Sequence, residues 1–152
     1  MTAIKELHEV MVTEAQLAEG LAVVLEQQQE AIINSRGEDL GLLLQKSEDL
    51  IQPITTLENE RTRLANLIIS EKIKRGSVQG KPATSRDLLS CLGDKDAVLM
   101  QDVIRRLQTA SREVLRINNL NKPLLEHSHC FVKQTLRAAT DDYKKNLIDK
   151  RM

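Results

Sequence analysis

The stretch Arg116-Ile-Asn-Asn-Leu-Asn-Lys-Pro-Leu-Leu125 sets two of its asparagines three residues apart, Asn118 and Asn121, inside an otherwise apolar helical repeat. Apolar residues recur there at alternating steps of three and four, along a seam that runs Leu107, Ala110, Val114, Ile117, Asn121 and Leu124. Asn121 therefore occupies a position where a coiled-coil helix normally buries an aliphatic side chain. We predict that it bonds a neighbouring helix and fixes register, although helix geometry alone equally fits a solvent-facing residue beside a kink at Pro123.

A second seam with the same repeat predicts a long helix near the start of the chain, over residues 3–33. Its positions are Leu7, Val10, Glu14, Leu17, Leu21, Val24, Gln28 and Ala31. The polar run at residues 34–37 then breaks the pattern. Ser35, followed three residues later by Glu38, has the spacing of a capping box that opens the next helix.

The most regular seam follows and predicts a second long helix that continues to about residue 74. It runs Leu43, Ser47, Leu50, Ile54, Leu57, Arg61, Leu64, Ile68 and Glu71. Pro53 lies inside it, and the repeat resumes in phase afterwards, so we expect a kink and no break.

The remaining segments complete an all-α prediction. Residues 75–85, rich in Gly, Pro and small polar side chains, predict a mobile loop. A short helix over residues 86–91 and a third long helix over residues 95–147 follow. We therefore predict a single domain over residues 1–152, an elongated antiparallel bundle of three long helices plus one short helix, with an overhanging C-terminal helix.

Composition argues against several functional classes. Aromatic residues make up only 1% of the chain, too few for a nucleic-acid reader built on aromatic stacking. No apolar run of about eighteen residues and no signal region occur, so we expect no membrane insertion and a cytoplasmic location. Two cysteines are too few for a disulfide framework and fit a reducing compartment.

The charge is unevenly placed although the formal net charge is zero. Residues 1–60 carry 12 acidic and 3 basic side chains, and the rest of the chain carries 10 acidic and 19 basic ones. A bundle that packs the last helix on the first two pairs these opposite charges internally. A basic surface for nucleic acid or a membrane is the competing interpretation, but Arg105, Arg106 and Arg112 alternate with seam residues and form no basic tract.

One constellation has the residue types of a metal site. Glu126-His-Ser-His129 matches the Glu-x-x-His spacing of di-iron bundles, but such a site needs two copies and this chain has one. His127 and His129 diverge by about 200° on a helix, so they cannot share one ion. We predict no metal, no cofactor and no catalytic residue.

The third long helix is predicted to be about fifteen residues longer than its partners, an overhang of about 20 Å. An apolar stripe continues along this extension, residues 125–152, at Leu125, Val132, Leu136, Ala139, Tyr143 and Leu147. A stripe without an intramolecular partner suits the capture of another protein's amphipathic helix. Fraying of the end, or a homodimer that pairs through it, are the alternatives. Asn118, one step off the seam, is the candidate recognition residue beside the stripe.

Two motifs resemble the FlgN family of flagellar export chaperones. Lys46, Leu50, Ile54, Leu57, Glu58 and Arg61 form K-x(3)-L-x(3)-I-x(2)-L-E-x(2)-R, and residues 118–125 form N-x-x-N-x-x-L-L. The similarity extends from the first helix to about Leu136. It implies an all-helical cytoplasmic protein that holds the hook-filament junction proteins FlgK and FlgL by their C-terminal helices and delivers them to the flagellar type III export gate. Members often end in a segment with Tyr followed by Gly, and Tyr143 lacks that Gly.

Together the overhang and the resemblance predict a non-enzymatic export chaperone for unassembled flagellar axial proteins. In that mechanism a disordered client helix becomes ordered as it buries its apolar face against the stripe. The alternative is a structural coiled-coil adaptor or self-associating bundle that releases no client.

Overall fold

The structure, a computed structural model, describes the backbone of residues 2–73 and 85–151 and the side chains of residues 3–71 and 85–127. Within these residues it is all-helical, which confirms the predicted fold class. The elements are α1 (Thr2–Ile33), α2 (Gly37–Ile73), α3 (Ser85–Ser90) and α4 (Asp94–Arg151). The predicted loop at 75–85 lies outside the described residues apart from Ser85, which begins α3.

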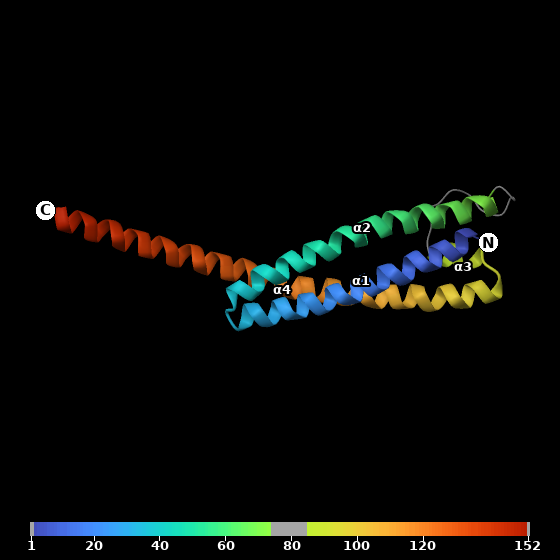
Figure 1. Cartoon of the computed structure of the whole chain (residues 1–152), viewed down its shortest axis with the longest axis horizontal. Coiled ribbons are helices and arrows are strands. Elements are labelled where there is room, and N and C mark those ends of the chain that lie inside the picture. The colour runs from blue at the N-terminus through green and yellow to red at the C-terminus, as the bar shows by residue number, and fades with distance from the viewer. Residues whose placement is uncertain (1, 74–84, 152) are drawn as a thin grey trace.

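The three long helices alternate in direction along the bundle, with α1 in the middle (Figure 1). Gln28 contacts Leu43 on the antiparallel α2, whereas Leu25 contacts Asn121 on α4, which runs parallel to α1. Both α2 and α4 pack on α1, but no Cα atoms of α2 and α4 in the described residues approach within 8 Å. Helix α1 is therefore the shared support of the bundle.

The turn between α1 and α2 is a Schellman motif, which corrects the predicted capping box. Ser35 has a φ of 54°, the left-handed conformation that ends a helix. The Arg36 N–H donates to the Ala31 carbonyl at 2.8 Å, and the Ser35 N–H donates to the Ile32 carbonyl at 3.2 Å. Ser35 therefore closes α1, and the carbonyl of Arg36 accepts the first bond of α2 from Leu40.

Two groups of apolar side chains form the core. The first, which we call the large cluster, joins α1, α2, α3 and α4 at the end of the bundle where the chain begins. Its buried members are Leu7, Met11, Ala15, Leu64, Ile68, Ile69, Leu88, Met100, Val103, Ile104 and Leu107. The second, the small cluster, lies nearer the α1–α2 turn and consists of buried Leu21, Ala22, Leu25 and Ile117, with Leu50, Ile54 and Val114 partly buried around them.

Helix α4 continues far beyond the other helices. It has 58 residues, against 32 in α1 and 37 in α2, and its orange-to-red half runs past the α1–α2 turn in Figure 1. Residues 126–151 span roughly 40 Å at 1.5 Å per residue. The overhang is thus longer than the predicted length of about 20 Å, because α4 continues to Arg151 and exceeds α1 by 26 residues (58 against 32) where about fifteen were expected.

Candidate functional site

The candidate site is the end of the bundle where α4 passes the α1–α2 turn. Each long helix contributes one buried polar side chain there, namely Gln28, Ser47 and Asn121. All three occupy seam positions of their helices, where an apolar residue is usual. We call these three residues the polar layer, and it closes the small cluster on the side of the overhang.

Hydrogen bonds to backbone carbonyls hold the polar layer. The Gln28 amide donates from Nε2 to the Leu43 carbonyl at 3.1 Å, which joins α1 to α2. The Asn121 amide donates from Nδ2 to the Leu25 carbonyl at 2.7 Å, which joins α4 to α1. Because buried amides lose water on folding, such bonds favour one alignment of the helices over slipped ones. That Asn121 serves as a register device remains a prediction.

Asn121 also carries an unsatisfied acceptor. Its side chain is only 1% exposed, and its Oδ1 has no hydrogen-bond partner in the described residues. A buried polar atom without a partner costs about 1–3 kcal/mol, so it needs an explanation. The atom lies just before the overhang begins, where any helix added alongside α4 would meet the bundle.

A buried ion pair separates the large cluster from the small one. Arg61 of α2 donates from Nε to Oε2 of Glu14 on α1 at 2.9 Å, and the Glu14 side chain is buried. Burial raises the pKa of the Glu14 carboxyl above its usual value, and the charge and hydrogen bond of Arg61 only partly oppose this. Both residues are seam positions, so the apolar seam is interrupted at this level.

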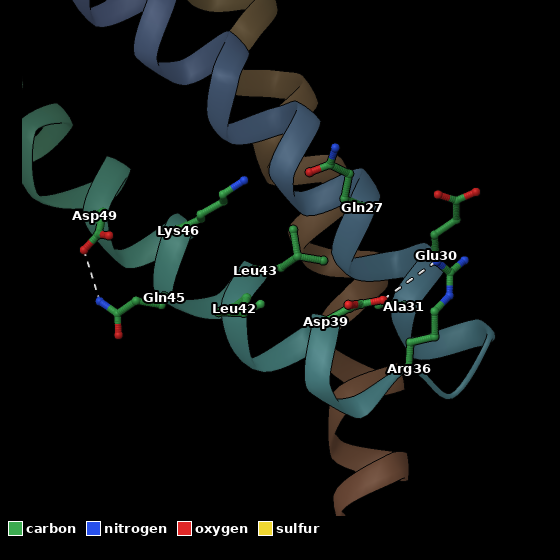
Figure 2. A pocket seen from close by; sticks show the side chains of 10 residues that line it. All are labelled: Gln27, Glu30, Ala31, Arg36, Asp39, Leu42, Leu43, Gln45, Lys46 and Asp49. Atoms are coloured by element: carbon green, nitrogen blue, oxygen red, sulfur yellow. Dashed lines mark hydrogen bonds and ion pairs between the residues drawn. The ribbon is translucent and has the colours of Figure 1, made fainter.

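A cleft of about 580 Å³ lies between the end of α1 and the start of α2 (Figure 2). Figure 2 shows Leu43 between the two helices, with Arg36 and Asp39 beside the turn. The rest of the lining is mainly charged or polar, including Glu30 and Lys46. The cleft shows that the first turns of α2 pack loosely on α1.

The predicted partner-binding residues divide into two groups. Asn118 is exposed and Leu125 is half-buried, and both lie on α4 where it leaves the bundle. The other predicted residues belong to the helical overhang, and their side chains lie outside the described residues: Val132, Leu136, Ala139, Tyr143 and Leu147. Their role as a binding stripe remains a prediction.

The charge asymmetry is used inside the bundle. Both ion pairs between helices in the described residues join an acidic side chain of α1 to an arginine from the basic part of the chain. These are Glu14 with Arg61 and Glu19 with Arg106, the latter at 2.7 Å. The contacts support internal pairing as the reason for the asymmetry.

Sequence reasoning missed a set of exposed apolar side chains on the first half of α2. Leu42 is 69% exposed and Ile51 is 48% exposed, and Leu44 is also exposed. These positions fall outside the α2 seam, so the seam gave no reason to examine them. The sequence does contain a sign of them, because this part of the helix has more aliphatic residues than a single seam needs.

Neither a metal site nor a membrane span is found in the part of the chain that the structure describes. No group of three potential metal ligands gathers there. The side chains of His129 and Cys130 lie outside that part. No helix searched has a stretch apolar and long enough to cross a bilayer.

Comparison with models of protein families gives a match over most of the chain. The family model described as FlgN protein matches residues 1–147. The match covers all four helices and includes both the polar layer and most of the overhang. No curated protein and no solved structure matches the chain.

Proposed function

Because this chain belongs to the FlgN family of flagellar export chaperones, we propose that it binds the unassembled hook-filament junction proteins FlgK and FlgL by their C-terminal helices. It then delivers them, in the cytoplasm, to the flagellar type III export gate. A client helix held in this way is kept from premature assembly, because its apolar face is buried against the chaperone. The proposed role needs no catalytic residue.

The length of α4 is the observation that carries this proposal. Residues 126–151 extend past the α1–α2 turn and lie alongside no other described helix (Figure 1). A lone helix in water is only marginally stable, so this segment gains from a partner. The stripe predicted from Leu125 to Leu147 would offer such a partner an apolar face at helical spacing.

A paired substitution on the stripe tests the proposal. Leu136→Asp with Tyr143→Asp should abolish binding of FlgK and FlgL C-terminal peptides in titration calorimetry. The melting temperature should stay nearly unchanged, because stripe residues contribute to the partner interface and little to the bundle. A matched control is Gln134→Asp with Ala138→Asp, which adds the same charge opposite the predicted stripe and should leave binding intact.

Two outcomes would contradict the proposal. Unfolding of the Leu136 and Tyr143 variant would mean that the stripe belongs to the core. An equal loss of binding in the control variant would mean that the added negative charge alone weakens binding of the client peptide, wherever it is placed. Asn118→Ala adds a finer test. Because Asn118 is exposed, losing its side chain should weaken peptide binding if it is a recognition residue, and the fold should stay intact.

The alternative, a self-associating adaptor, fits the same overhang if two copies pair through α4. Sedimentation at several protein concentrations separates the two functions. If the protein is an export chaperone, any dimer should dissociate when a client peptide binds, because the dimer contact and the peptide would use the same apolar stripe. A dimer that persists at saturating peptide would favour the adaptor.

A further inference from the structure

We propose that the first half of α2, residues 37–60, is a displaceable cover, and that a client's amphipathic helix takes its place against α1 and α4. The inference rests on the proposed chaperone function and deepens it by adding a second part to the binding surface. The client helix would then contact the small cluster as well as the overhang.

Burial differs sharply between the two halves of α2. In residues 37–60 the only buried side chain is Ser47, a polar residue that bonds the Leu44 carbonyl of its own helix. Leu50 and Ile54 are only partly buried against the small cluster. In residues 61–71, by contrast, three aliphatic side chains are buried: Leu64, Ile68 and Ile69. The first half of α2 is therefore held by much less apolar contact than the second.

The segment also has natural limits at both ends. Arg61 is anchored to Glu14, and beyond it the large cluster holds the second half of α2. The Schellman turn at Ser35 ties the other end to α1. Pro53 lies between these limits and has no N–H, so the Asp49 carbonyl lacks its usual helical donor. The helix is thus weakest inside the segment that would move.

Displacement leaves the chain connected without strain. The part of α1 that residues 37–60 must span, from Glu14 to Ile33, is roughly 30 Å long at 1.5 Å per residue. An extended chain covers about 3.3 Å per residue, so the released segment forms a slack loop between two fixed ends. The large cluster does not have to open.

The surface beneath the cover matches a helix in shape and chemistry. It presents Leu21 and Leu25 of α1 beside Ile117 of α4, and it leads directly into the overhang because α1 and α4 run parallel. The unsatisfied Oδ1 of Asn121 lies at the junction. An incoming helix with a Ser, Thr, Asn or Gln opposite Asn121 would supply the missing donor. Selection of such a client would need both features, the apolar surface and the unsatisfied Oδ1 of Asn121.

Weakening the cover should therefore strengthen client binding. Opening is part of the binding equilibrium, and the observed affinity scales with the fraction of molecules already open. Leu50→Ala with Ile54→Ala removes apolar contact with the small cluster and should tighten binding of FlgK or FlgL C-terminal peptides about tenfold. The matched control is Leu42→Ala with Ile51→Ala, which makes the same chemical change at exposed positions and should leave affinity unchanged.

Hydrogen exchange on the parent protein tests the same inference without any substitution. Amides of residues 38–57 should exchange at least tenfold faster than those of residues 61–71, because local opening exposes the former first. Adding a peptide should speed exchange in residues 38–57 further and slow it in residues 18–28 and 110–125. A peptide seated only on the overhang would leave residues 38–57 unchanged.

The outcomes separate this inference from the proposed function. If the parent binds the peptides but residues 38–57 keep or gain protection, the cover does not move and the inference is overturned while the chaperone function stands. If neither peptide binds the parent, the proposed clients are wrong. The proposal that a client helix replaces residues 37–60 is then wrong as well. If residues 38–57 exchange faster at higher protein concentration when no peptide is present, a second copy of the chain occupies the surface. That outcome also overturns the inference.

Discussion

The large and small clusters are built from the same helical repeat but reach different depths of burial. In the large cluster α3 lies over the open side, and Leu88 of α3 is itself buried. In the small cluster no fourth element is present among the described residues, and the α2 seam positions Leu50 and Ile54 stay partly exposed. The comparison shows that a seam determines which face of a helix turns inward, while neighbouring elements determine how deeply it is buried.

Polar residues sharpen this difference. The small cluster lies between the Glu14–Arg61 ion pair and the polar layer of Gln28, Ser47 and Asn121. Burying polar groups contributes less stability than burying aliphatic ones of similar size. The end of the bundle beside the overhang should therefore be the less stable end, as the proposed displacement of residues 37–60 requires.

The largest expected effect compares one leucine from each cluster on the same helix. Leu64→Ala should destabilise the protein by about 3 kcal/mol, because it removes a side chain that is only 1% exposed from a closed core. Leu50→Ala should cost only about 1 kcal/mol, since its side chain is partly exposed already. Urea unfolding followed by circular dichroism measures both. Equal losses would show that the two clusters are equally well packed.

An intermediate effect is expected where the two clusters meet. Arg61→Gln leaves the Glu14 carboxylate buried without its cation and should cost about 2 kcal/mol near pH 7. Arg63→Gln is the matched control, because in the described residues the ion pair of Arg63 is with Glu60 on the surface of the same helix, and the change should have no measurable effect.

The pH dependence of this loss follows from the direction of the Glu14 pKa shift. Burial raises the folded-state pKa of Glu14, so its contribution to stability is fully present below the unfolded value of 4.5 and is lost as the pH rises through the folded pKa. Without Arg61 that folded pKa rises further. The deficit of Arg61→Gln should therefore shrink as the pH falls toward 4.5, measured by unfolding at several pH values. A deficit that is constant with pH would mean that lost packing, and not charge, is responsible.

The smallest expected effect concerns Asn121. Asn121→Leu gives up one hydrogen bond but removes an unsatisfied buried acceptor, so thermal stability should hold or rise by about 1 kcal/mol. If Asn121 fixes register, the variant should also form mixed oligomers on a sizing column. A variant that melts well below the parent and stays a single species would show that the space cannot accept Leu. In that case the amide is needed for packing and not for register.

Much of the fold was predictable because helix period and helix breaks are local properties. The three long helices begin and end within a few residues of the predicted bounds, and α2 continues through Pro53 as the in-phase repeat indicates. The start of α2 was not predictable in the same way. Ser35 fits either a cap for α2 or the left-handed end of α1, and only the bonds of the turn decide between them.

The candidate site was predictable only in part. The interrupted seam marked Asn121 as unusual, but no pattern in one helix says which carbonyl its amide reaches or that its Oδ1 stays unpaired. The α2 seam gave Leu50 and Leu64 equal standing, although their burial differs. Each of these facts depends on what lies opposite the residue, and a single helix does not contain that information.

The amino-acid sequence by itself determined the helices, their inward faces and the long extension of α4, because periodicity and breaking residues act within a few turns of the chain. The tertiary structure alone decided that α1 is the middle helix. Its buried residues spread beyond the predicted seam to Met11, Ala15, Ala18 and Leu25, since two neighbours cover it from different sides. Contact on two faces needs two partners, and which helix receives both is settled only when all three pack together.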